Sequence, residues 1–242
     1  MENNIKQLFL SAENKSNKLE KYFDVYDKLF SKYKNKDIIF VEIGVHNGGS
    51  LEIWQKYFTV NSRIIGIDLN PECKKFEKEN IEIYIGNQSD ENFWNDFFSK
   101  VGNVDIILDD GGHTNLDQIT TTVNVIDKIN DGGTLLIEDT ITSYIKEYNS
   151  NKKFIFINFS KKLIDDINSK SNKSDNNFKF SLNNYIYSLQ FFEGMVAFYI
   201  DRSKCKNNQL ISNDGKDDKI QDLTWKGNEI NILKIKNLLK KI

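Results

Sequence analysis

The chain has 242 residues, of which 39% are hydrophobic, and a formal net charge of −2. This size and composition fit one α/β domain with a packed core, and the near-neutral charge argues against a general affinity for nucleic acid. Two cysteines in no metal-binding spacing give no disulfide framework. Since the start of the chain has no apolar leader and no run is as long as a membrane span, we expect a cytoplasmic protein without a membrane partner.

The first predicted element is a helix from about Asn14 to Lys34, where apolar residues recur at helical spacing. It precedes the main sheet and would pack on it or cover a ligand crevice. We therefore expect an N-terminal helical segment at residues 1–36 and the main domain at residues 37–242.

Short apolar runs then alternate with amphipathic segments. Strands are expected at residues 37–43, 63–69, 81–85, 104–108 and 134–137. Helices are expected at 50–58, 71–79, 90–100 and 115–129. This alternation predicts an α/β fold with a doubly wound, mostly parallel sheet.

After residue 146 the pattern changes. Residues 146–177 are polar with an apolar island at 154–159, and residues 169–177 have the composition of a mobile stretch. Runs at 185–192 and 195–200, separated by Glu193-Gly194, predict a hairpin. A parallel sheet of seven strands that ends in an antiparallel hairpin is typical of class I methyltransferases. Residues 232–242 are expected to form a packed surface helix, with a membrane-surface or acidic-partner site as the alternative.

The loop after the first strand has the composition of a ligand-binding turn. Gly44 and Gly48 permit a tight turn, and Asn47 and Ser50 stand beside them. The G-x-G-x-x-G pattern of a pyrophosphate site is absent. Glu42, at the strand end, would repel a diphosphate but suits a cationic ligand such as S-adenosylmethionine.

Polar residues follow the next three strands as well. Asp68 lies 24 residues after Gly44, a spacing that suits hydrogen bonds from ribose hydroxyls. Residues after the third strand are candidates for adenine contacts, and Asp109 ends the fourth strand. The adenine candidates are Asn87, Gln88 and Ser89. Taken singly, each of these residues also fits a loop or capping role.

Three acids come just after the fourth and fifth strands. Because neighbouring strand ends meet at one edge of the sheet, Asp110, Glu138 and Asp139 are expected to converge, which is costly unless a cation joins them. Carboxylates suit Mg²⁺, and His113, three residues after Asp110, is then a candidate base. The alternatives are helix-capping roles for the acids and a structural role for the histidine.

On these motifs the chain resembles the magnesium-dependent, S-adenosylmethionine-dependent sugar O-methyltransferases. The resemblance covers about Phe40 to Tyr144 and is carried by VEIGVHNGGS, GIDLNP, ILDDGGH and GGTLLIEDTITSY. It implies that residues 37–242 form the methyltransferase domain, that Asp110, Glu138 and Asp139 hold Mg²⁺, and that His113 is the base. Gly112 and Asp117 depart from the family pattern, which usually has a serine and frequently a second histidine there.

The implied reaction transfers a methyl group from S-adenosylmethionine to a hydroxyl of a small sugar substrate, either nucleotide-linked or part of a glycan precursor. Mg²⁺ would lower the pKa of the hydroxyl, and His113 would take its proton. A catechol-type metal-dependent O-methyltransferase, an NAD-dependent oxidoreductase and a non-catalytic cofactor-binding partner stay open as alternatives. A homo-oligomer also stays open, because residues 14–34 and 146–177 would serve self-association as readily as substrate closure.

Overall fold

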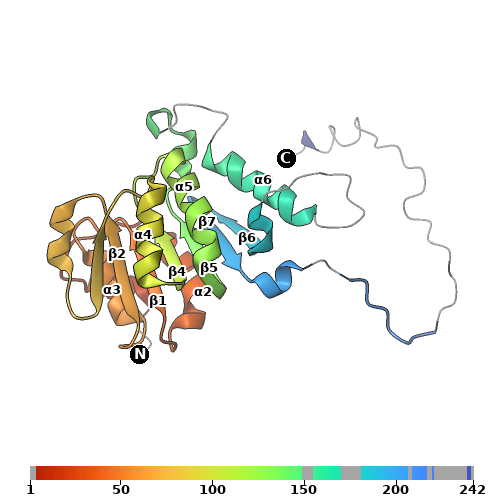
Figure 1. Ribbon diagram of the computed structural model, residues 1–242, viewed down its shortest axis with the longest axis horizontal. Coiled ribbons are helices and arrows are strands. Elements are labelled where there is room, and N and C mark those ends of the chain that lie inside the picture. The colour runs from red at the N-terminus through yellow and green to blue at the C-terminus, as the bar shows by residue number, and fades with distance from the viewer. Residues whose placement is uncertain are drawn as a thin grey trace. The chain divides into compact units, whose positions relative to one another are not determined.

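The structure, a computed structural model, describes residues 4–148, 155–169, 181–206, 209–216, 220 and 239–240. The chain divides into two units, residues 1–208 and 209–242, and every element named below belongs to the first (Figure 1). The surface helix expected at residues 232–242 lies, apart from residues 239 and 240, outside the described residues.

Seven strands form a single sheet in the order β3-β2-β1-β4-β5-β7-β6. The first five are parallel, and β7 runs antiparallel to both β5 and β6. The strands are β1 (Ile39–Ile43), β2 (Arg63–Asp68), β3 (Ile81–Ile85), β4 (Val104–Asp109), β5 (Ile129–Ile137), β6 (Ile186–Phe192) and β7 (Met195–Ile200). The predicted mostly parallel sheet with a C-terminal antiparallel hairpin is therefore confirmed.

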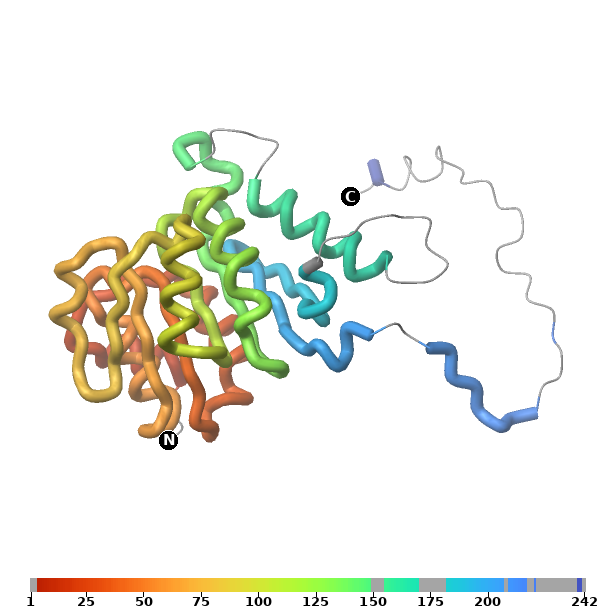
Figure 2. The backbone as a smooth tube through the Cα atoms, viewed as in Figure 1, coloured from red at the N-terminus to blue at the C-terminus, as the bar shows by residue number. Residues whose placement is uncertain are grey.

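Side chains that alternate along each strand build a core on each face of the sheet. Phe40, Ile64 and Leu136 point to the face covered by α1 (Ile5–Leu10), α2 (Tyr22–Phe30) and α3 (Gly49–Tyr57). Val41 and Ile65 point to the opposite face, covered by α4 (Glu91–Val101), α5 (Asn115–Val125) and α6 (Phe156–Asn168). Figure 2 traces the backbone through these strands and helices, coloured from red at the N-terminus to blue at the C-terminus. Burial on both faces explains why the strands read as continuous apolar runs.

Short 3₁₀ segments join these elements. They are Ser31–Tyr33, Pro71–Phe76, Ile126–Lys128, Thr140–Tyr144, Lys146–Tyr148, Ser181–Asn184 and Arg202–Cys205. No helix in the described ranges is long and apolar enough to cross a membrane.

The N-terminal segment differs from the sequence prediction. The helix expected from Asn14 begins only at Tyr22, and α1, which was not predicted, precedes it. Between them, residues 12–21 form a non-helical segment, called the strap below. Tertiary contacts replace helical hydrogen bonds in the strap. The amide of Glu13 and the side chain of Asn14 donate to the carboxylate of Glu52 in α3, at 3.0 and 2.7 Å. A Cβ on Gly49 would meet the carbonyl oxygen of Asn14 at 2.4 Å, so the strap needs a glycine there.

The described part of the polar region after β5 contains a helix. Within the predicted apolar island, Ile155 is the N-cap of α6, and Phe156 and Leu163 of that helix are buried in the core. The predicted mobile stretch lies, from residue 170 onward, outside the described residues.

Candidate active site

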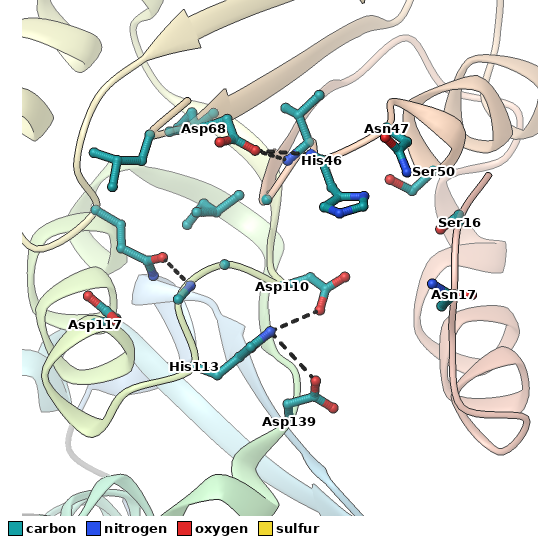
Figure 3. Close-up of a pocket in the computed structure, with 18 of the residues that line it drawn as sticks. Ser16, Asn17, His46, Asn47, Ser50, Asp68, Asp110, His113, Asp117 and Asp139 are labelled. Carbon is teal, nitrogen blue, oxygen red and sulfur yellow. Dashed lines mark hydrogen bonds and ion pairs between the residues drawn. The ribbon is translucent and has the colours of Figure 1, made fainter. Parts of the chain in front are cut away.

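A cavity of about 530 Å³ opens at the carboxyl ends of the parallel strands (Figure 3). Its lining comes from the loops after β1, β2, β3, β4 and β5, and from residues 15–17 of the strap. The strand order reverses between β1 and β4, and ligands of open α/β sheets bind at such a reversal. The cavity volume is that of an ordinary cofactor site.

The loop between β1 and α3 passes very close to the loop after β4. Gly44 has φ +96°, and a Cβ there would lie 2.1 Å from the carbonyl oxygen of Asp110. Gly48, at φ +75°, is the N-cap of α3, and a side chain there would meet Phe76. Both glycines are therefore required by the path of the backbone.

Glu42, at the end of β1, is fully buried beneath this loop. Its Oε2 accepts a hydrogen bond from Ser50 Oγ at 2.7 Å, and its Oε1 lies 3.7 Å from Lys18 Nζ. Burial raises the pKa of Glu42 to about 7, although Lys18 opposes the shift. Ser50 itself lines the cavity, so this pair extends the polar wall inward.

Asp68 ends β2 and faces the cavity. Its Oδ2 accepts from the amides of Val45 and His46 at 2.8 and 3.0 Å, and its Oδ1 accepts from the amide of Asn70 at 2.8 Å. Burial opposes ionisation of Asp68, but these amides outweigh it and lower the pKa of the carboxyl. Asp68 thus holds the β1–α3 loop in place as a carboxylate.

Of the three residues predicted to contact adenine, two line the cavity and one does not. Asn87 and Gln88 line the cavity, and Gln88 Nε2 donates to both oxygens of buried Asp109 at 3.0 Å. Burial raises the pKa of Asp109 to about 6. Ser89 does not line the cavity, and its hydroxyl donates to Asp117.

The two departures from the family pattern are in contact with each other. A Cβ on Gly112 would lie 2.4 Å from Asp117 Oδ2. Asp117 is the third residue of α5 and forms a capping box with Thr114. An aspartate that caps α5 in this way therefore requires glycine at position 112.

Asp110, His113 and Asp139 form a compact group at the edge of the cavity. One potential ligand atom from each lies within 4.8 Å of the others, and none of the three is fully buried. His113 Nε2 is 3.9 Å from Asp110 Oδ1 and 3.7 Å from Asp139 Oδ2 (Figure 3). The sheet brings the two acids together: Asp110 N donates to the carbonyl of Ile43, and Glu138 N to that of Asp109.

Backbone strain gathers at the same cavity. Within the described residues, the non-glycine residues with positive φ are His46, His113 and Asp139, at 47°, 57° and 51°. All three line the cavity. Each left-handed conformation costs about 1 kcal/mol or more, and such residues cluster at functional sites.

Glu138, the third acid predicted to bind metal, lies on the inner side of this group and is 1% exposed. Its carboxylate accepts from the hydroxyl of Tyr26 and from Lys18 Nζ, the latter at 3.3 Å to Oε1 and 3.1 Å to Oε2. Asp139 accepts from the hydroxyl of Tyr22 at 2.7 Å. Helix α2 therefore reaches both acids through its tyrosines.

Lys18 is one of the site residues that the sequence does not mark. Its ammonium donates to Asp110 Oδ2 at 2.6 Å, and its side chain is 3% exposed. Burial alone would lower the pKa of Lys18, but the carboxylates of Glu138, Asp110 and Glu42 raise it well above its ordinary value. Lysine is frequent in this chain and the strap was predicted as helix, so no local signal marked Lys18.

Most of the predicted site residues line one cavity. Those that do are Gly44, Asn47, Ser50, Asp68, Asn87, Gln88, Asp110, His113 and Asp139. Those that do not line it are Glu42, Gly48, Ser89, Asp109 and Glu138.

Among curated proteins, the chain is similar to sugar O-methyltransferases. The chain is 29% identical over 130 residues to an 8-demethyl-8-α-L-rhamnosyl tetracenomycin-C 2′-O-methyltransferase of Streptomyces olivaceus, covering 51% of this chain and 34% of that protein. It is 32% identical over 126 residues to a mycinamicin VI 2″-O-methyltransferase of Micromonospora griseorubida, covering 49% and 31%. The chain thus spans about a third of the length of these curated relatives. No protein-family model matches it.

The fold agrees with that of a solved relative. The MycE methyltransferase of the mycinamycin biosynthetic pathway, in complex with Mg and SAH, superposes with a TM-score of 0.77 at 22% identity, covering 90% of this chain and 58% of that one. The chain is therefore a homologue of the macrolide and tetracenomycin sugar O-methyltransferases over about half of its length, and it has the Rossmann-like fold of class I methyltransferases.

Proposed function

We propose that this protein transfers a methyl group from S-adenosylmethionine to a hydroxyl of a sugar, with a bound Mg²⁺ and with His113 as the base. The observation that carries the proposal is the grouping of Asp110, His113 and Asp139 beside a cofactor-sized cavity at the strand reversal. The sugar O-methyltransferase relatives, and the Mg and SAH in the solved relative, support the same chemistry.

The donor set fits a magnesium ion. Asp110 Oδ1 and Asp139 Oδ2 are carboxylate oxygens that face the same space beside His113, and Mg²⁺ prefers such ligands. We assign the metal to Asp110 and Asp139. Glu138, the third predicted ligand, is engaged by Lys18 and Tyr26. When bound, Mg²⁺ would act as a Lewis acid that lowers the pKa of an acceptor hydroxyl.

His113 would then take the proton. The acceptor oxygen attacks the methyl carbon, the carbon–sulfur bond breaks, and the hydroxyl proton passes to His113 Nε2. Holding oxygen, carbon and sulfur in line would supply much of the remaining rate.

The cofactor is assigned to the part of the cavity formed by the first three strand ends. Asp68 offers oxygen atoms for the ribose hydroxyls of the cofactor, and Asn87 and Gln88 offer amides near its adenine ring. Gly44 lets the backbone come close, and Asn47 and Ser50 supply polar contacts. Glu42, Gly48, Ser89 and Asp109 would act from behind the wall, by shaping this loop system.

The test is a methyl-transfer assay of the full chain with S-adenosylmethionine and two acceptor sets, nucleotide-linked hexoses or heptoses and catechols. We expect methylation of a sugar that EDTA stops and Mg²⁺ restores. Indifference to EDTA would contradict the metal assignment. Transfer to catechols alone would favour the catechol-type alternative.

A further inference from the structure

The ammonium group of Lys18 lies inside the acid cluster of the active site. Three carboxylates surround it: Asp110 Oδ2 at 2.6 Å, Glu138 Oε2 at 3.1 Å and Glu42 Oε1 at 3.7 Å. It also lies 5.8 Å from the ring centre of Tyr26. A lysine side chain that is 3% exposed and faces three acids serves as their cation.

The strap that carries Lys18 is attached firmly at both ends. At one end Asn14 is bonded to Glu52 of α3, and at the other the next residue, Tyr22, donates to Asp139 through its hydroxyl. The strap then continues directly into α2. Lys18 is therefore delivered to the acids by a defined backbone path.

Lys18 divides the acids into two groups of oxygen atoms. Both oxygens of Glu138 and the Oδ2 of Asp110 face the ammonium. The Oδ1 of Asp110 and the Oδ2 of Asp139 face His113 instead. Asp110 and Asp139 line the cavity, whereas Glu138 is 1% exposed and does not line it.

We propose that Lys18 is a positioning residue that serves as the built-in counter-ion of Glu42, Glu138 and one oxygen of Asp110, and so confines the divalent metal to Asp110 and Asp139. This inference rests on the proposed function. Lys18 withdraws Glu138 from the metal and weakens metal binding, because its charge repels a cation beside it. With only two protein carboxylates on it, the metal would keep coordination positions for the sugar acceptor and could be released.

The test measures binding of Mn²⁺ alone to the full chain, by titration calorimetry and electron paramagnetic resonance, in the absence of acceptor. Lys18→Met keeps the length of the side chain and removes its charge, so we expect Mn²⁺ to bind about tenfold more tightly. Lys21→Met is the matched control, because Lys21 lies in the same strap but its side chain is 74% exposed and paired with Glu193. We expect the control to bind Mn²⁺ as the wild type does.

Glu138→Gln separates the inference from a purely structural role of Lys18. In the wild-type background we expect it to change the Kd for Mn²⁺ by less than threefold. In the Lys18→Met background, where Glu138 is free to bind metal, we expect it to remove most of the gain. If Lys18→Met does not fold, the Kd for Mn²⁺ of Glu138→Gln in the wild-type background decides whether Glu138 is a metal ligand.

The outcomes are distinguishable. A tenfold or greater loss of Mn²⁺ affinity in Glu138→Gln alone would make Glu138 a ligand and overturn the inference. Unchanged or weaker binding in folded Lys18→Met would overturn it as well, while the proposed function would stand. If neither the wild type nor any variant binds Mn²⁺, the metal part of the proposed function fails and the inference fails with it.

Discussion

At the scale of single residues, the candidate active site combines strained backbone conformations with closely spaced ionisable side chains. His113 and Asp139 both hold left-handed conformations, at φ 57° and 51°, and their side chains meet at 3.7 Å. A free chain would avoid these conformations, so the surrounding structure must enforce them. Under the proposed function, this enforced geometry would hold the proposed base beside a proposed metal ligand.

His113→Asn tests the base directly. Asparagine tolerates a left-handed backbone better than most residues, so the loop should keep its conformation while the base is lost. We expect turnover to fall roughly 10² to 10⁴-fold, and the affinity for S-adenosylhomocysteine, measured by calorimetry, to stay within threefold of wild type. Full turnover in a folded His113→Asn protein would discard the base assignment.

Glu42 makes the stability of the metal-free protein depend on pH. Its pKa is raised by burial from 4.5 to about 7, so between these values the folded state binds a proton that the unfolded state has released. Its contribution is therefore fully present below pH 4.5 and is lost as pH rises through 7. We expect Glu42→Gln to remove a decline of up to about 3 kcal/mol over that interval.

Urea denaturation at several pH values between 4.5 and 8 measures this effect. Asp109, whose pKa is raised to about 6, gives a decline of the same sign that persists in the variant. Identical slopes in wild type and Glu42→Gln would show that Glu42 titrates normally.

At the scale of elements, the approach of two loops places the site. The β1–α3 loop and the loop after β4 touch at Gly44, where the carbonyl of Asp110 leaves no room for a Cβ. The same contact fixes the backbone that presents the acid at position 110. A change at Gly44 therefore acts on the fold and on the site together.

We expect Gly44→Ala to destabilise the protein by roughly 3 kcal/mol or more, because it adds a steric clash to an unfavourable φ. Gly102→Ala is the matched control: Gly102 has φ +76°, but a Cβ there meets nothing within 4 Å. At φ 76° and ψ −159° the substitution adds backbone strain of about 1 to 3 kcal/mol but no clash, so the loss should be smaller than at Gly44. Urea denaturation compares the two, and equal losses would show that the clash at Gly44 is relieved by movement of the loop.

At the scale of the whole molecule, the sheet provides a crevice and the N-terminal segment supplies one of its walls. Residues 15–17 line the cavity, although they precede the first strand (Figure 3). The expected division into residues 1–36 and 37–242 stays a prediction. The segment before residue 37 nevertheless contributes Lys18, Tyr22 and Tyr26 to the acid cluster.

Ligand-induced stabilisation should separate the methyltransferase proposal from the oxidoreductase alternative. S-adenosylhomocysteine at a concentration of about 100 times its Kd stabilises the folded state by about 2.7 kcal/mol, which should raise Tm by roughly 5 to 10 °C. NAD at the same concentration should leave Tm unchanged, because the glycine pattern of a pyrophosphate site is absent. A rise with NAD alone would contradict the cofactor assignment.

The sequence by itself determined the sheet and the position of the crevice, because strands buried on both faces are visible as short apolar runs and their polar ends mark one edge. It also identified most of the cavity wall between Gly44 and Asp139, although five of the residues that it pointed to do not line the cavity. Only the tertiary structure decided that residues 12–21 are not helical and that Lys18 lies among three acids. Those contacts join residues 24 to 120 positions apart, and no local pattern records them. The same contacts decided that Glu138 faces inward, because a buried carboxylate takes the nearest cation and hydroxyl that the fold provides.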